Sequence, residues 1–132
     1  MGAEPWQYFV PHRTDLQAAL EELKEQEFRA GRYRYSEEGP QSIDEARDIA
    51  DADGTASILD IDRVDAQPDF GLVTPLTTGQ LLALFGTDKP TRDLVEACDD
   101  LYEDIERGQG VVCRVYKHGQ PSELCFTGYS YD

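Results

Sequence analysis

The spacing of apolar residues along the chain predicts a succession of short strands and helices. Alternation of apolar and other residues is typical of half-buried strands, whereas apolar residues three and four positions apart are typical of helices with one buried face. We therefore expect strands at residues 6–10, 32–35, 58–61, 70–73, 111–116 and 123–129, and helices at residues 14–31, 42–54, 78–86 and 91–107.

Capping residues support the predicted helix boundaries. Thr14 and Ser42 each lie three residues before a Gln or Glu, which is the spacing of a capping box at a helix N-terminus. Thr78 and Thr91 are the residues at which the two later helices are expected to start. A glycine follows each predicted helix and provides a C-terminal stop.

The last two strands predict a hairpin whose register depends on the length of its turn. A four-residue loop over 118–121 sets Val115 opposite Leu124 and keeps the proline of the loop out of the ladder. A two-residue turn at 118–119 instead places Val115 opposite Ser122. We prefer the four-residue loop, because it pairs apolar residues with each other.

The order of these elements predicts the fold class. A chain of 132 residues suits a single domain, here residues 1–132. Unevenly spaced helices and a closing hairpin indicate an α+β fold, with an antiparallel or mixed sheet, helices mostly on one face and a C-terminal β-hairpin.

The strong negative charge of the chain restricts the kinds of molecule that it can bind. The net charge of −15 lies in two segments: residues 37–65 have ten acidic and two basic side chains, and residues 93–106 have seven acidic and no basic ones. Such a field repels nucleic acids and anionic membranes and attracts cationic partners or metal ions. We therefore expect neither a nucleic acid nor a membrane as partner.

The remaining composition predicts a cytoplasmic protein. No apolar run approaches the about 20 residues of a membrane helix, and residues 1–13 lack the pattern of a secretory signal. Cys98, Cys113 and Cys125 lie among apolar residues without the spacing of a metal site, which favours reduced, buried thiols.

The segment 51–62 has oxygen-bearing residues at alternating positions, as calcium loops do. With Asp51 and Asp53 first and third and Asp60 and Asp62 near its end, it resembles an EF-hand loop in the spacing of its acids. Its glycine comes too early and a strand is expected to follow, so the alternative is a helix end and an Asp-Gly turn with solvated acids.

The predicted last helix has an almost wholly acidic outer face. Asp93, Glu96, Asp100, Glu103 and Asp104 fall on this face, and several lie three or four residues apart, where like charges destabilise a helix. This crowding favours a docking surface for a basic protein. The alternative is an ordinary amphipathic surface helix.

The chain has a single basic and aromatic stretch, residues 28–35. Arg32 and Arg34 alternate with tyrosines, as in sites that bind phosphates or stack on bases. With the surrounding negative charge, we expect these arginines to pair with the acidic segments or to hold a small anionic ligand.

The residues that carry catalysis are few. His12 follows a proline and His118 lies in the predicted hairpin turn, and neither lies beside a cysteine or serine in a known nucleophile setting. No glycine-rich loop joins a strand to a helix as phosphate binding requires. We therefore do not expect an enzyme, although a small enzyme remains an alternative.

Small size, strong acidity and the lack of catalytic motifs resemble, in composition, bacterial antitoxin-like, immunity and inhibitor proteins. The leading hypothesis is an acidic interaction module that binds a cationic protein through residues 93–104. The alternatives are a calcium-binding domain at Asp51, Asp53, Asp60 and Asp62, and a small enzyme or a domain that binds an anionic ligand at Arg32 and Arg34.

Overall fold

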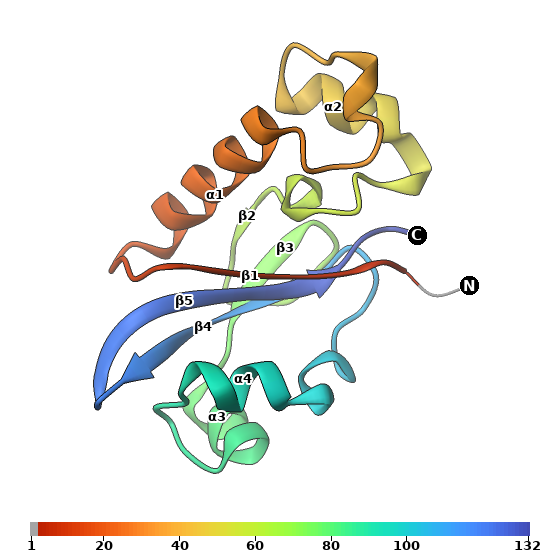
Figure 1. The fold of residues 1–132 in the computed structure, drawn as a ribbon. Helices are drawn as coiled ribbons and strands as arrows, with labels where there is room; N and C mark the ends of the chain where they lie inside the picture. The colour runs from red at the N-terminus through yellow and green to blue at the C-terminus, as the bar shows by residue number, and fades with distance from the viewer. Residues whose placement is uncertain (1–2) are drawn as a thin grey trace.

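A five-stranded mixed sheet forms the centre of the structure, a computed structural model that describes residues 3–132 (Figure 1). The strands are β1 (Pro5–Pro11), β2 (Arg63–Val64), β3 (Leu72–Pro75), β4 (Gly110–Lys117) and β5 (Gln120–Tyr129), in the order β1-β5-β4-β3-β2. β5 pairs antiparallel with β1 and β4, whereas β3 pairs parallel with β4 and β2. The α+β class, the mixed sheet and the C-terminal hairpin are confirmed.

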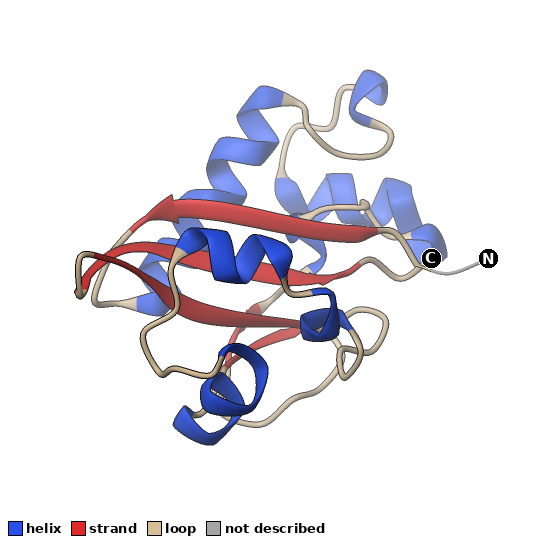
Figure 2. Ribbon diagram, turned by 60° about the horizontal axis from the view of Figure 1, so that its bottom comes forward, coloured by secondary structure: helices blue, strands red, loops and turns tan. Residues whose placement is uncertain are grey.

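Four α-helices of the described residues cover both faces of the sheet. They are α1 (Leu16–Ala30), α2 (Ile43–Ala50), α3 (Thr78–Phe85) and α4 (Arg92–Ala97). Where the sequence predicts helices mostly on one face, α1 and α2 lie on one face and α3 and α4 on the other (Figures 1 and 2). No helix within residues 3–132 has the length and hydropathy needed to cross a membrane.

Both faces of the central strands are apolar, which explains the helices on both sides. Leu20 of α1 packs with Phe126 in one core, and Val95 of α4 belongs to a second core. Since neighbouring strand residues point to opposite faces, the apolar run of β4 supplies both cores, Val112 the first and Cys113 the second.

Two segments predicted as strands are turns and short 3-10 helices. Residues 32–35 form a turn after α1, in which Tyr35 has a φ of 68°. The 3-10 helix η3 (Ile58–Asp60) is capped by Ser57, whose hydroxyl accepts a hydrogen bond from the Leu59 N–H at 3.2 Å. All residues of η3 are buried, so its apolar and acidic alternation does not reflect the one-sided burial of a strand.

The helix starts lie within one residue of the predicted positions. α1 begins after Asp15, one residue later than predicted, because the Asp15 carboxylate accepts a hydrogen bond from the Ala18 N–H at 3.1 Å. α2 begins after Ser42 as predicted. α3 begins after Thr77, one residue earlier, and Thr77 forms a reciprocal capping box with Gln80.

The hairpin has a two-residue turn, so the preferred four-residue loop is wrong. His118 and Gly119 have positive φ angles of 52° and 76°, as in a type I′ turn. A register shift between Val115 and Tyr116 then places Val115 opposite Glu123, which is neither of the predicted partners. The irregularity lets the proline of β5 enter the strand next to an unpaired position.

Candidate functional site

Residues 93–106, which we name the acidic segment, do not form the continuous helix that the sequence predicts. α4 ends one residue before Cys98, which is extended with φ −89° and ψ 92°. The 3-10 helix η4 (Asp99–Tyr102) and a turn follow. Val95 and Leu101 are buried as the predicted apolar face requires, but they belong to two separate elements.

Repulsion between the carboxylates gives a physical reason for this break. In a continuous helix Glu96 would lie one turn from Asp100, and Asp100 one turn from Asp104, and each such pair destabilises a helix by about 0.2–0.5 kcal/mol. Aspartate is also a poor helix former, and negative charge near a helix C-terminus opposes the helix dipole. At the break the Cys98 thiol donates a hydrogen bond to the Leu84 carbonyl of α3 at 3.7 Å.

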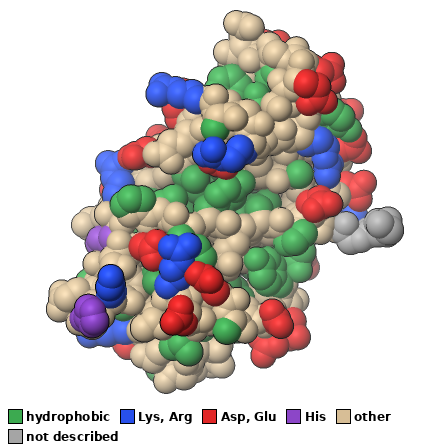
Figure 3. Space-filling model, viewed as in Figure 1, with side chains coloured by type: hydrophobic (Ala, Val, Ile, Leu, Met, Phe, Trp, Pro, Cys, Tyr) green, Lys and Arg blue, Asp and Glu red, His purple; other side chains and the backbone are tan. Residues whose placement is uncertain are grey.

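The carboxylates of the acidic segment have almost no partners inside the protein. All seven are exposed. Glu96 pairs with Arg92 at 2.6 Å, and the other six accept no hydrogen bond and form no ion pair within residues 3–132. Acidic side chains accordingly appear at the bottom of Figure 3, where α3 and α4 lie. Their charge is therefore available to an external cation.

Helix α3 lies beside the acidic segment and exposes apolar side chains. Residues 81–85 read Leu-Leu-Ala-Leu-Phe, yet no residue of α3 is buried. Leu82 is 50 % exposed, and Leu94 of α4 is 43 % exposed. Leu81, Leu84 and Phe85 are half-buried against the second core, so α3 covers that core with one side and leaves Leu82 and Ala83 exposed on the other. Contiguous exposed apolar surface marks interaction sites.

A groove of about 380 Å³ separates α3 from η4. Its apolar lining includes Pro75, Leu76, Ala83, Leu84, Leu101 and Ile105. Asp100 and Asp104 contribute carboxylates, and no basic residue lines the groove. A more open hollow of about 400 Å³ between α3 and α4 shares Leu84 and Asp100 with the groove. Apolar hollows and free carboxylates therefore form one continuous surface.

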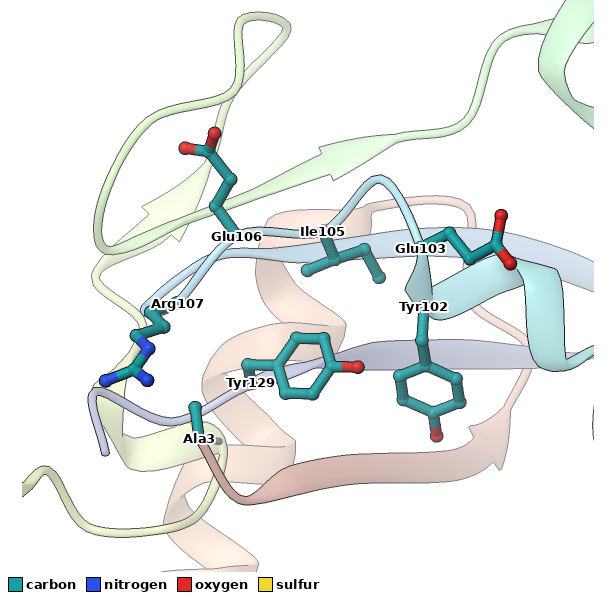
Figure 4. A pocket seen from close by; sticks show the side chains of 7 residues that line it. All are labelled: Ala3, Tyr102, Glu103, Ile105, Glu106, Arg107 and Tyr129. Carbon is teal, nitrogen blue, oxygen red and sulfur yellow. The ribbon is translucent and has the colours of Figure 1, made fainter. Parts of the chain in front are cut away.

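A further hollow of about 650 Å³, open to solvent, lies against the acidic segment (Figure 4). The rings of Tyr102 and Tyr129 pack edge to face with centroids 5.6 Å apart, and Glu103 and Arg107 lie toward opposite ends of the hollow. Burial raises the pKa of Tyr102. Because this hollow carries both signs of charge, the groove is the more selective for a cation.

The five residues predicted to bind a partner are divided among three places. Asp100 and Asp104 line the groove, and Glu103 lines the hollow beside the two tyrosines. Asp93 and Glu96 remain on α4. They do not share the single helical face that the sequence predicts, because the helix is broken.

Asp60, a predicted calcium ligand, is the centre of a buried polar network. Its carboxylate accepts hydrogen bonds from the Thr55 N–H at 2.7 Å, the Thr55 hydroxyl at 2.8 Å and the Ser130 hydroxyl at 2.9 Å. Asp60, Thr55 and Ser130 are each at most 1 % exposed. The network joins η3 to the segment that follows β5, which indicates a structural role.

The other predicted calcium ligands are exposed, and two of them have partners. The Tyr35 hydroxyl donates to the Asp53 carboxylate at 2.6 Å, which raises the pKa of Tyr35. Asp62 forms an ion pair with Arg47, and Asp51 is exposed. No three His, Cys, Asp or Glu side chains of residues 3–132 lie together as metal ligands would. Calcium binding stays a prediction, which a shift of melting temperature with calcium would test.

The arginines predicted to bind an anionic ligand bond within the protein. Arg32 donates to both carboxylate oxygens of the buried Glu27, at 2.7 Å to the nearer one. Arg34 donates to the main-chain oxygens of Asp53 at 2.7 Å and Asp132 at 3.2 Å. Both arginines thus bond internally, but not to the carboxylates of the two acidic stretches as the sequence alternative expected, because Glu27 belongs to α1 and Arg34 bonds to main-chain oxygens.

The two histidines lie far from these arginines. His12 follows the end of β1, and its main-chain N–H donates a hydrogen bond to the Ser122 carbonyl at 3.1 Å, near the turn that contains His118. Arg34 contacts Asp132, which follows the opposite end of β5. The structure thus does not bring His12 and Arg34 together around one site.

Sequence reasoning missed α3 as part of the site. The signal was available, because residues 78–85 contain no charged side chain and the run 81–85 has no polar position. A surface helix normally has one polar face, so its lack indicates either full burial or an external cover.

Comparison with known proteins identifies no relative: no protein-family model, no curated protein sequence and no solved structure matches the chain.

Proposed function

We propose that the protein is a small acidic interaction module that binds a cationic protein through the acidic segment and α3. One observation carries the proposal: six exposed carboxylates without partners in residues 3–132 lie beside a helix that exposes its apolar side chains. Either feature alone is common on protein surfaces. Their combination resembles the apolar centre and charged rim of a protein interface.

The two features have separate physical roles in such a complex. Exposed carboxylates attract Lys and Arg side chains over roughly one Debye length, about 8–10 Å at ordinary ionic strength, and so accelerate association. The apolar side chains of α3 provide the area whose burial holds the complex together. The same negative charge disfavours nucleic acids and anionic membranes as partners.

The experiment isolates the partner and then removes the charge at the proposed site. The tagged protein captures proteins from a lysate of the cells that make it, at low and at high salt, and mass spectrometry identifies them. Calorimetry with the purified partner then compares the wild type with the triple variant Asp100→Lys, Glu103→Lys, Asp104→Lys. We expect the affinity to fall at least about a hundredfold, since several rim charges change sign.

A matched control separates local from overall charge. The triple variant Glu37→Lys, Glu38→Lys, Asp44→Lys makes the same change in net charge at exposed positions outside the acidic segment. We expect it to lose less than about threefold in affinity, an effect of screened, distant charges. An unchanged affinity of the first variant, or an equal loss in both, would show that the acidic segment is not the binding site.

A further inference from the structure

The dimensions and lining of the groove fit an inserted side chain. Its volume of about 380 Å³ falls in the range of about 300–1,000 Å³ that is typical of sites that bury small ligands. Leu84 and Leu101 provide apolar walls, and Asp100 and Asp104 provide carboxylates. Such a lining suits an apolar group next to a positive charge.

Charge complementarity distinguishes between possible occupants. A second copy of this chain would bring another acidic segment with seven carboxylates and no basic residue against the first. Like charges opposed across an interface disfavour this arrangement. A basic segment of another protein is attracted by the same carboxylates and also fits the apolar walls.

We propose that the groove is the anchor site for an amphipathic, basic segment of the partner. An apolar side chain of that segment enters between Leu84 and Leu101, and a neighbouring Lys or Arg pairs with Asp100 and Asp104. This inference rests on the proposed function and names the chemistry of the partner.

The test selects peptides from a phage-displayed random library against the purified protein and measures selected peptides by fluorescence anisotropy. We expect the enriched sequences to combine Lys or Arg with Leu, Ile, Phe or Trp. Enrichment of sequences without basic residues, enrichment of basic sequences without apolar ones, or no enrichment would each overturn the proposal.

Variants then locate the bound peptide. Ala83 is exposed and lines the groove, so Ala83→Trp fills the groove without changing charge. We expect it to weaken peptide binding at least about tenfold, which corresponds to about 1.4 kcal/mol. Ala30→Trp, at an exposed alanine at the end of α1, is the matched control and leaves binding unchanged. Equal affinities of Ala83→Trp and the wild type would overturn the proposal.

A charge variant keeps the test valid if Ala83→Trp disturbs the fold. Asp100→Asn with Asp104→Asn removes the proposed ion pairs at exposed positions. We expect this variant to bind the selected peptides less tightly than the wild type does. Unchanged binding would overturn the proposal.

The failure of this inference is distinguishable from the failure of the proposed function. If the lysine variants of the acidic segment lose the partner but Ala83→Trp keeps it, the protein binds a cationic partner outside the groove. If sedimentation shows that the wild type is a dimer and that Ala83→Trp is a monomer, the groove is occupied by a second copy of the chain. The proposal of a basic partner segment is then overturned.

Discussion

The two faces of the sheet differ in where their charged groups find partners. On the face of α1 and α2, Glu27 is buried and bonds to Arg32, and the Asp60 carboxylate accepts three hydrogen bonds. Lys24 donates to the Ile61 carbonyl at 2.5 Å, and burial lowers its pKa. On the face of α3 and α4, six carboxylates of the acidic segment have no partner in residues 3–132, and Leu82 of α3 is exposed.

This difference teaches that acidity alone does not identify an interaction surface. Residues 37–65 have ten acidic side chains, more than the seven of the acidic segment. Several of the ten, such as Asp53, Asp60 and Asp62, stabilise the loops around η3. The acidic segment stabilises nothing comparable. An acidic side chain that bonds to another group of the chain is therefore structural, whereas one without such a bond is available for binding, whatever the number of charges nearby.

The strongest test of the comparison is the truncation of one leucine on each face. Leu20 is fully buried, and we expect Leu20→Ala to lower the free energy of unfolding by about 2–5 kcal/mol through lost burial and a cavity. Leu82 is 50 % exposed, and we expect Leu82→Ala to change it by less than about 0.5 kcal/mol. Urea unfolding measures both. A large loss in Leu82→Ala would show that Leu82, like Leu81, Leu84 and Phe85, belongs to the core.

The corresponding test for charge compares two aspartates. Asp60→Ala leaves the Thr55 N–H, the Thr55 hydroxyl and the Ser130 hydroxyl without their acceptor, so we expect a loss of about 2–3 kcal/mol. Asp100→Ala removes an exposed carboxylate without partners in residues 3–132, so we expect a change within about 0.5 kcal/mol. Urea unfolding at neutral pH provides both values. Similar losses would contradict the division between structural and available acids.

Much of the fold could be predicted because one-sided burial leaves a periodic signal. α1 and β1 were predicted with errors of one or two residues at their ends. The errors share a different cause. Residues 58–61 look like a strand only if Asp60 faces solvent, whereas Thr55 and Ser130 hold it in the interior. Local patterns do not reveal partners that are distant in sequence.

The site could be predicted only in part for a related reason. The concentration of charge in residues 93–106 is visible in the sequence, but the break at Cys98 depends on repulsion and on a contact with α3. The groove is formed by residues 66–84 and 100–111, which the parallel pairing of β3 with β4 brings together. No spacing within either segment indicates that contact.

Stability at alkaline pH tests whether water is excluded from the second core, which contains Cys113 and Cys125. Burial raises the pKa of Cys113 to about 12 and that of Cys125 to about 11. The unfolded state releases these two protons at a lower pH than the folded state does, so the raised pKa values add to the free energy of unfolding. This contribution is complete below the ordinary thiol pKa of about 8.5 and is lost as the pH rises to the raised pKa values. We expect stability to fall by about 1 kcal/mol per pH unit for each thiol above about pH 9.

Two measurements check this expectation. Urea unfolding across the alkaline range gives the slope, and Cys113→Ala should flatten it. Iodoacetamide treatment of the native protein at mildly alkaline pH, followed by peptide mass spectrometry, should leave Cys113 and Cys125 unmodified. Rapid labelling of either would mean that α4 does not seal the core below the acidic segment.

The smallest expected effect concerns the stability cost of the acidic segment. Asp100 and Asp104 are like charges in the same groove lining, so Asp100→Asn with Asp104→Asn should raise the free energy of unfolding by up to about 0.5 kcal/mol at low salt, the scale of interactions between exposed charges. Salt screens the repulsion, so the gain should vanish at high ionic strength. Thermal unfolding of both proteins at the two salt concentrations measures the effect. A variant that is more stable yet binds the partner less tightly would assign this charge to the complex rather than to the fold, and a destabilised variant would place Asp100 and Asp104 among the structural acids.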